Sequence, residues 1–136
     1  MKINLTHLIL LVVAAPAFAE TTHQLTASVP FRFTVGSKTF EPGDYRVDAL
    51  AGTHATIVRS TDFKTSAIVQ TNSVTSAAPQ TQGRLVFRCG EGRCVLSEIW
   101  EPGTASGRSI VQSKRDRELT TRVGIPARVR VSVALR

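Results

Sequence analysis

Hydrophobic and polar residues alternate with a period of two along much of the chain. Residues 29–35 place valine and phenylalanine at every second position, with polar residues or proline between them. This is the pattern of a β-strand with one buried face. Residues 128–135 alternate in the same way, with valine or leucine against arginine and other residues. The pattern therefore predicts a protein built from strands.

Turn-forming residues divide the chain into short segments. Gly36, Gly52, the Pro42–Gly43 pair and the Pro102–Gly103 pair stand between β-branched or aromatic runs, and such residues mark tight turns. Strands are expected over residues 29–35, 38–40, 45–47, 55–60, 66–71, 84–87, 95–100, 108–111 and 128–135. Short strands at this spacing predict an all-β fold, a small antiparallel β-sandwich or a partly open barrel.

Two connections interrupt this series. Residues 73–83 are long and poor in hydrophobic side chains, which predicts a loop. Residues 113–121 are a helical candidate, because Ser113 can cap a helix and Asp116 follows three residues later. A helix this short is unstable alone, and a charged turn fits the segment equally well. We expect one short C-terminal helix at most.

The chain is long enough for one domain with a modest core. We expect a signal peptide over 1–19, a flexible lead-in over 20–28, a β domain over 29–119 and a C-terminal extension over 120–136 with a strand at 128–135. That strand either completes the sheet or forms a free edge. The predicted core consists of Val29, Phe31, Phe33, Val35, Tyr45, Val47, Ile57, Ile68, Leu85, Phe87, Leu96, Ile99 and Trp100.

Residues 1–19 have the three parts of a secretory signal peptide. Lys2 is basic, residues 8–15 are apolar, and the Ala17-Phe18-Ala19 tripeptide offers a cleavage site before Glu20. The apolar run is shorter than the ~20 residues that span a bilayer as a helix, and no later segment reaches that length. We therefore expect an exported protein, periplasmic or extracellular, with no transmembrane segment in the mature chain.

Cys89 and Cys94 enclose two glycines between strand-like runs, which predicts a β-hairpin. Residues paired across such a hairpin lie about 4.5 to 5.5 Å apart, within reach of a disulfide. Export favours oxidation, so we expect a Cys89–Cys94 disulfide. A redox pair would have two residues between its cysteines. A zinc site would need further ligands, and His23 and His54 do not have ligand-like spacing with the cysteines.

The chain carries 17 lysine and arginine residues against 10 aspartate and glutamate residues, a formal net charge of +7, mostly from arginine. Such a balance favours anionic partners. Export argues against nucleic acid, which leaves anionic lipid headgroups, a surface polysaccharide or an acidic protein. Arg84, Arg88 and Arg93 around the cysteine hairpin are the best-grouped contacts. The arginines are also spread along the chain, as on solvated outer faces.

The sequence has no recognisable enzyme signature. It lacks the G-x-S-x-G nucleophile elbow and a phosphate-binding glycine loop. A glycosidase-like acid pair could in principle be drawn from Asp44, Asp48, Glu98 and Glu101. Glu98 lies near Trp100, as in some sugar sites, but an arginine across the sheet is its expected partner. We predict no catalytic residue, no cofactor and no metal site.

Two segments carry a family resemblance. VPFRFTVG at 29–36, followed by FEPGDYRV at 40–47, resembles a family of small exported bacterial proteins abundant in acidobacteria, with the pattern VPFxFxVG and then PAGxYxV. The resemblance continues in RLVF at 84–87, LSEIW at 96–100 and SKRDREL at 113–119. It implies an exported β-protein and no assigned activity. Residues 120–136 extend beyond the family's usual end.

Three functions fit these observations. The first is a non-enzymatic binding or interaction module of the cell envelope that contacts an anionic component or another protein chain. The second is a structural or assembly protein whose C-terminal strand adds to a neighbouring sheet. The third is a hydrolase of unrecognised type.

Overall fold

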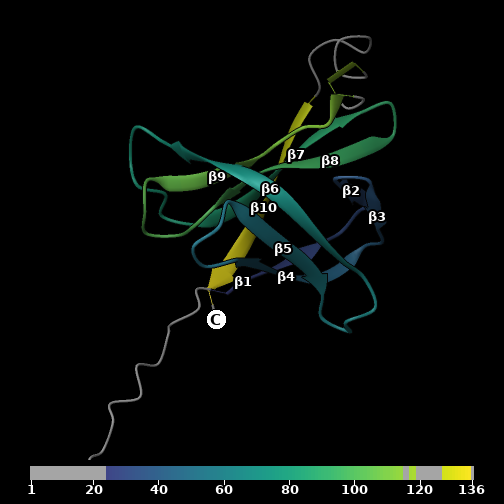
Figure 1. The fold of residues 1–136 in the computed structure, drawn as a ribbon, viewed down its shortest axis with the longest axis horizontal. Helices are drawn as coiled ribbons and strands as arrows, with labels where there is room; N and C mark the ends of the chain where they lie inside the picture. The colour runs from purple at the N-terminus through teal and green to yellow at the C-terminus, as the bar shows by residue number, and fades with distance from the viewer. Residues whose placement is uncertain (1–23, 115–116, 119–126, 136) are drawn as a thin grey trace, which may run out of the picture.

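The computed structural model describes residues 24–114, 117–118 and 127–135, with the backbone alone for residues 127 and 133–135. The fold is all-β, as predicted (Figure 1). The ten strands are β1 (Leu25–Val29), β2 (Phe33–Val35), β3 (Lys38–Phe40), β4 (Gly43–Ala49), β5 (Ala55–Ser60), β6 (Ser66–Thr75), β7 (Gly83–Gly90), β8 (Arg93–Trp100), β9 (Ser106–Ile110) and β10 (Ala127–Leu135). No helix among the described residues is long and apolar enough to cross a bilayer.

The strands are hydrogen-bonded in the order β3-β2-β8-β7-β10-β1-β4-β5-β6-β9, and β9 pairs again with β8. Eight strands therefore return on themselves, while β2 and β3 lie outside the ring. Within the ring, β1 and β10 share the fewest residue pairs, namely Leu25 with Leu135 and Thr26 with Ala134. This arrangement is consistent with the predicted all-β class, a sandwich or a partly open barrel.

β6 and β10 are shared between two sheets. The start of β6 pairs with β5 and its end with β9, whereas β10 pairs with β7 over most of its length and with β1 at its end. Strands that change sheets in this way form the corners of sandwich-like barrels. We call β1, β4, β5 and the start of β6 the first sheet. The second sheet comprises β7, β8, β9 and β10, with β2 and β3 at its edge.

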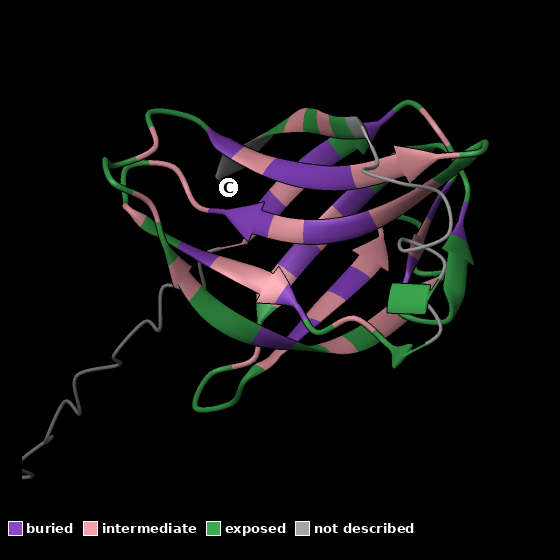
Figure 2. Ribbon diagram, turned by 90° about the horizontal axis from the view of Figure 1, so that it is seen from above, coloured by how far each residue is buried: buried purple, intermediate pink, exposed green. Residues whose placement is uncertain are grey.

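Aromatic rings fill much of the space between the sheets. Phe33 lies at their centre, with ring centroids 5.2 Å from Phe40, 5.0 Å from Tyr45 and 5.2 Å from Phe87. Buried and more exposed positions alternate along several of the strands, such as β1 and β4 (Figure 2). The Tyr45 hydroxyl donates to the Glu41 carbonyl, and burial, with smaller contributions from nearby carboxylates, raises the Tyr45 pKa.

Three residues of the predicted core lie elsewhere. Ile57 and Ile68 pair with each other on the outer face, and Ile68 is 65% exposed. Their strands have adjacent apolar residues, so alternation does not fix which of them faces inward; in β5 it is Thr56 and Val58 that are buried. Trp100 is buried, but on the outer side of the second sheet, because the inward positions of β8 are Leu96 and Ile99.

The remaining predicted core residues are confirmed. Phe31 is only partly buried but packs against the core, and its ring meets Phe87 edge-on at 5.0 Å. The other members are buried in the central cluster, namely Val29, Phe33, Val35, Tyr45, Val47, Leu85, Phe87, Leu96 and Ile99.

Two predicted boundaries near the N-terminus need correction. β1 begins at Leu25, so residues 25–28 belong to the sheet and not to a flexible lead-in. The predicted strand over 29–35 is two strands, broken at residues 30–32. Pro30 explains the break, because proline has no amide hydrogen for a sheet ladder. The predicted signal peptide and its cleavage site lie outside the described residues.

The C-terminal strand is confirmed as β10, and it completes the ring instead of forming a free edge. Residues 120–136 therefore contribute a strand to the same domain. The predicted loop over 73–83 starts later, because β6 continues to Thr75. The helical candidate over 113–121 falls partly outside the described residues; within it, the Arg117 amide donates to the Ser113 carbonyl at 3.1 Å.

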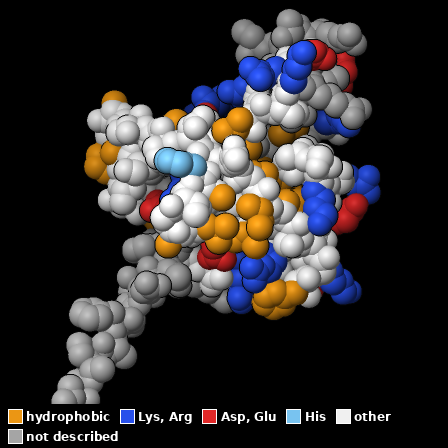
Figure 3. All heavy atoms as spheres, in the orientation of Figure 1, with side chains coloured by type: hydrophobic (Ala, Val, Ile, Leu, Met, Phe, Trp, Pro, Cys, Tyr) orange, Lys and Arg blue, Asp and Glu red, His pale blue; other side chains and the backbone are white. Residues whose placement is uncertain are grey.

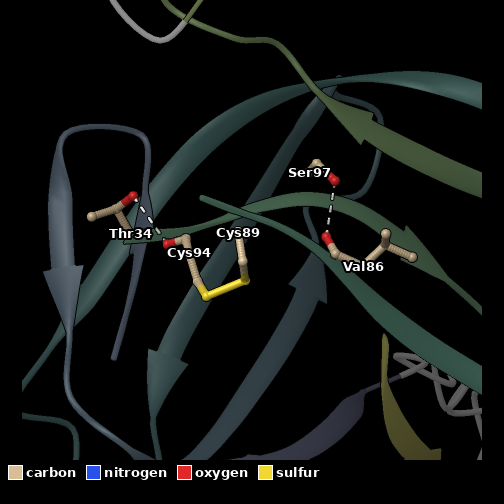
Figure 4. Close-up of a disulfide and its surroundings, with 5 residues drawn as sticks. All are labelled: Thr34, Val86, Cys89, Cys94 and Ser97. Atoms are coloured by element: carbon tan, nitrogen blue, oxygen red, sulfur yellow. Dashed lines mark hydrogen bonds between the residues drawn. A yellow bond between two sulfur atoms is a disulfide. The ribbon is translucent and has the colours of Figure 1, made fainter. Parts of the chain in front are cut away.

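The cysteine hairpin is tighter than predicted. Gly90 already pairs with Arg93, so the loop contains only Glu91 and Gly92, both with positive φ. Two such residues match the twist of a two-residue hairpin turn. Cys89 and Cys94 are directly opposed, with a Cα–Cα distance of 4.1 Å, and form the expected disulfide (Figure 4).

Removing this disulfide is expected to destabilise the fold moderately. It closes a short loop, for which the entropic contribution is about 2 kcal/mol. The double variant Cys89→Ser with Cys94→Ser should lose about that amount in chemical unfolding. Wild-type protein unfolded under reducing conditions serves as the control and should match the variant. An unchanged free energy of unfolding in both would contradict a structural role for the bond.

Candidate functional site

Alternation places arginines on the outer side of the second sheet. In β7, Leu85 and Phe87 point into the core, so Arg84 and Arg88 lie on the opposite side. In β10, Val129 and Val131 pack against the core, which places Arg128 and Arg130 outside. We call Arg84, Arg88, Arg128 and Arg130 the arginine face.

The register of β10 on β7 brings like charges together. Arg128 lies directly opposite Arg88, and Arg130 lies opposite Val86, between Arg84 and Arg88. Side chains directly opposed in an antiparallel pair have Cβ atoms about 4.5 to 5.5 Å apart, and like charges there are destabilising. Arg84 and Arg88 are four positions apart on one strand, about 13 Å. The face therefore concentrates positive charge at a cost in stability.

One carboxylate partly neutralises this charge. The Glu98 Oε1 atom lies 2.6 Å from an Arg128 guanidinium nitrogen, and its Oε2 atom accepts a hydrogen bond from Trp100 Nε1 at 2.8 Å. The expectation that Glu98 pairs with an arginine across the sheet is thus confirmed. No carboxylate among the described residues lies within ion-pair distance of Arg84, Arg88 or Arg130.

Trp100 supports the end of the face that Arg84 occupies. It lies opposite both Arg84 and Gly107 in the sheet, and the Arg84 guanidinium carbon is 6.0 Å from the indole centroid. A Cβ atom added to Gly107 would lie 2.5 Å from the indole ring. Only glycine at this position therefore leaves room for the indole. The Arg84 Nε atom is buried without a hydrogen-bond partner. This guanidinium is held in place with part of its donor capacity unused.

A shallow polar depression adjoins the face. Its volume is about 330 Å³, and its lining includes Arg88, Glu98, Asn72, Gln112 and Arg117. Small-molecule sites usually occupy about 300 to 1,000 Å³, so the depression is at the lower end of that range. Guanidinium, amide and hydroxyl donors around it suit oxygen-rich groups, and Arg88 belongs to both the depression and the arginine face.

The three arginines predicted from sequence lie on the same outer side of the second sheet. Arg84 and Arg88 lie on β7, and Arg93 is exposed opposite Gly90 at the hairpin end of β8, two residue pairs from Arg88. The prediction missed Arg128 and Arg130. Their alternation with valine was visible in the sequence, but the pairing of β10 with β7 was not. The largest group of cations therefore depends on a contact between distant segments.

The carboxylates considered for a hydrolase divide between the two sheets. Asp44 and Asp48 lie on β4 in the first sheet, whereas Glu98 lies on β8 in the second and Glu101 directly follows β8. The Asp44 side chain accepts a hydrogen bond from the Ser28 hydroxyl. His54 is exposed before β5, and His23 lies outside the described residues. Within the described part of the chain, no three histidine, cysteine or acidic side chains form a group suited to a metal ion.

Comparison with known proteins adds no further constraint on this site. No protein-family model, curated protein or solved structure matches the chain. The resemblance to the acidobacterial-type exported family stays a prediction, and the interpretation of the arginine face depends on its geometry alone.

Proposed function

We propose that this protein is an exported, non-enzymatic binding module whose arginine face holds an acidic polysaccharide of the cell envelope. The observation that carries the proposal is the direct opposition of Arg88 and Arg128, with one carboxylate nearby. A bound anion would relieve the repulsion between these guanidinium groups. Their stability cost in the free protein then becomes part of the binding energy.

The spacing of the face supports a polymer over a small anion. The arginines occupy two adjacent strands and extend about 13 Å along β7, so a single phosphate or sulfate could not contact all of them. A chain with repeating carboxylate or sulfate groups could contact several. Guanidinium groups suit this role because they bind such anions through paired hydrogen bonds.

The scaffold keeps the arginines in a fixed arrangement. β7 is paired on both sides, with β8 and with β10, and the Cys89–Cys94 disulfide closes its hairpin. The backbone conformational entropy lost on binding is consequently small. Positive charge on a rigid sheet also attracts a polyanion over long range, which predicts binding that weakens as salt is added.

Titration calorimetry with dextran sulfate tests the proposal, with uncharged dextran as the matched probe. We expect binding to the sulfated polymer alone, weakening with ionic strength. Arg88→Gln should weaken binding by about tenfold, which corresponds to one charge-assisted hydrogen-bonding group. Arg32→Gln is the control, because Arg32 is already paired with Glu41 at 2.9 Å and is 68% exposed. Equal losses in both variants, or no binding, would overturn the proposal.

Glu98→Gln is expected to change binding in the opposite direction. The variant removes the negative charge beside Arg128, while the amide oxygen can still accept the Trp100 hydrogen bond. Affinity for dextran sulfate should rise about two- to fivefold, the usual scale of a partly exposed ion pair. The same titration measures it. A lower affinity would instead show that the main effect of Glu98 is to position Arg128 for binding, and not to compete with the polyanion for the Arg128 guanidinium.

A further inference from the structure

The turn between β5 and β6 presents an aromatic side chain in a strained backbone conformation. Phe63 is 62% exposed and has a φ of 61°. Left-handed backbone is common for glycine and for asparagine, but it is an outlier for a bulky residue. A phenylalanine at this position therefore costs stability and leaves a large apolar group in water. Strain of this kind is often found at functional positions.

The rest of the turn holds Phe63 in this conformation. The Phe63 amide donates to the Ser60 carbonyl at 3.0 Å, and the Ser60 amide donates to the Thr65 carbonyl at 2.8 Å. The Asp62 carboxylate accepts from the Ser60 hydroxyl at 2.6 Å and from the Lys64 amide at 3.0 Å. These bonds lower the Asp62 pKa, so its contribution to the turn is present at neutral pH and is lost only as the pH falls through the lowered value.

Two arginines flank the exposed ring. The guanidinium carbons of Arg46 and Arg59 lie 5.9 and 5.7 Å from the Phe63 centroid, within the range of cation–π contacts. Arg46 and Arg59 are directly opposed across β4 and β5, so like charges meet here as they do on the arginine face. No carboxylate in the described part of the chain lies within ion-pair distance of either guanidinium.

Apolar side chains continue from this turn along the first sheet. Ile57 lies two positions from Arg59 on β5 and pairs with the exposed Ile68 on β6. The space-filling view shows hydrophobic side chains gathered over β5 and β6, with basic side chains beside them (Figure 3). We call Arg46, Ile57, Arg59, Phe63 and Ile68 the Phe63 patch. The patch lies on the outer side of a barrel sheet and not in a groove.

We propose that the Phe63 patch docks the protein on the surface of an anionic phospholipid bilayer. Exposed phenylalanine and isoleucine can enter the boundary between headgroups and acyl chains while the flanking guanidinium groups meet lipid phosphates. The outward-facing sheet suits a flat, deformable partner better than a peptide, which would need a groove or a free edge. A second copy of the chain is disfavoured, because it would bring Arg46 and Arg59 against identical charges.

Vesicle co-sedimentation of the full exported chain tests this inference. Vesicles of phosphatidylcholine alone are compared with vesicles that also contain phosphatidylglycerol, and we expect binding to the second kind. Phe63→Gly should reduce binding about tenfold, the effect of losing one buried phenylalanine. Its melting temperature should not fall, because glycine accepts the left-handed conformation freely. Arg59→Gln should also reduce binding, whereas Arg32→Gln should leave it unchanged, because Arg32 is already paired with Glu41 and lies outside both sites.

Each outcome is decisive. Equal binding to both kinds of vesicle, or unchanged binding by Phe63→Gly, would overturn the inference. So would the absence of vesicle binding in the wild type, an outcome that would point to an acidic protein as the partner of the patch. If Phe63→Gly failed to fold, Phe63→Asn would take its place, because asparagine also tolerates positive φ. None of these results depends on dextran sulfate binding, so the two proposals can fail separately.

Discussion

Replacing Phe33 by alanine is expected to lower the free energy of unfolding by about 3 to 5 kcal/mol. Phe33 is 1% exposed and contacts three other aromatic rings, so the variant would leave a cavity between β2, β4 and β7. Such a loss is a large share of the ~5 to 15 kcal/mol that stabilises a typical domain. Chemical unfolding monitored by circular dichroism measures it.

Ile68→Ala is the matched control for Phe33→Ala. Both residues belong to the predicted core, but Ile68 is 65% exposed on the outer side of β6. Its truncation should change the free energy of unfolding by no more than about 0.5 kcal/mol. Comparable losses in the two variants would show that the opposite face of β6 points into the core. Ile68 would then be buried and would not belong to the Phe63 patch.

Gly107→Ala is expected to destabilise the protein by about 1 to 3 kcal/mol, the usual cost of overpacking. The new methyl group would lie 2.5 Å from the Trp100 ring. The indole cannot move away freely, because its Nε1 atom is hydrogen-bonded to Glu98 and its ring lies against Arg84. Trp100 is the only tryptophan in the chain, so intrinsic fluorescence reports both the displacement and the unfolding transition.

Gly43→Ala separates steric overlap from the general cost of replacing a strand glycine. Gly43 also lies in a strand, but an added Cβ would meet its nearest neighbour, the Tyr45 ring, at 4.0 Å. We expect this variant to stay within about 0.5 kcal/mol of the wild type. If Gly107→Ala were equally harmless and left the fluorescence spectrum unchanged, Trp100 would not be packed over Gly107.

Local sequence features predicted much of the fold. The two cysteines around a glycine-containing turn specified a hairpin, and the alternation over residues 128–135 specified a strand. Both depend on neighbours in sequence, which is where turn chemistry and periodicity are informative. Pro30 shows the limit of periodicity, because the alternation continues through it while the hydrogen-bonded ladder does not.

The candidate sites depend on contacts between distant segments and could not be predicted in full. Arg88 was recognised beside the cysteines, but Arg128 joins it only through the register of β10 on β7. Ile68 appeared to be a core residue because its strand has apolar side chains on both faces. Phe63 stands between two predicted strands, and nothing local indicates that two arginines would flank its ring. Register is a property of the assembled sheet.

NMR of the arginine Nε–Hε groups during titration with dextran sulfate tests the binding proposal most directly, because it identifies the guanidinium groups that meet the anion. If the arginine face binds the polymer, the signals of Arg88 and Arg128 should shift together at the lowest polymer concentrations. The signals of Arg84 and Arg130 should follow, while the signal of Arg32 stays in place. Uniform small shifts of all exposed arginines, or shifts confined to Arg46 and Arg59, would contradict it.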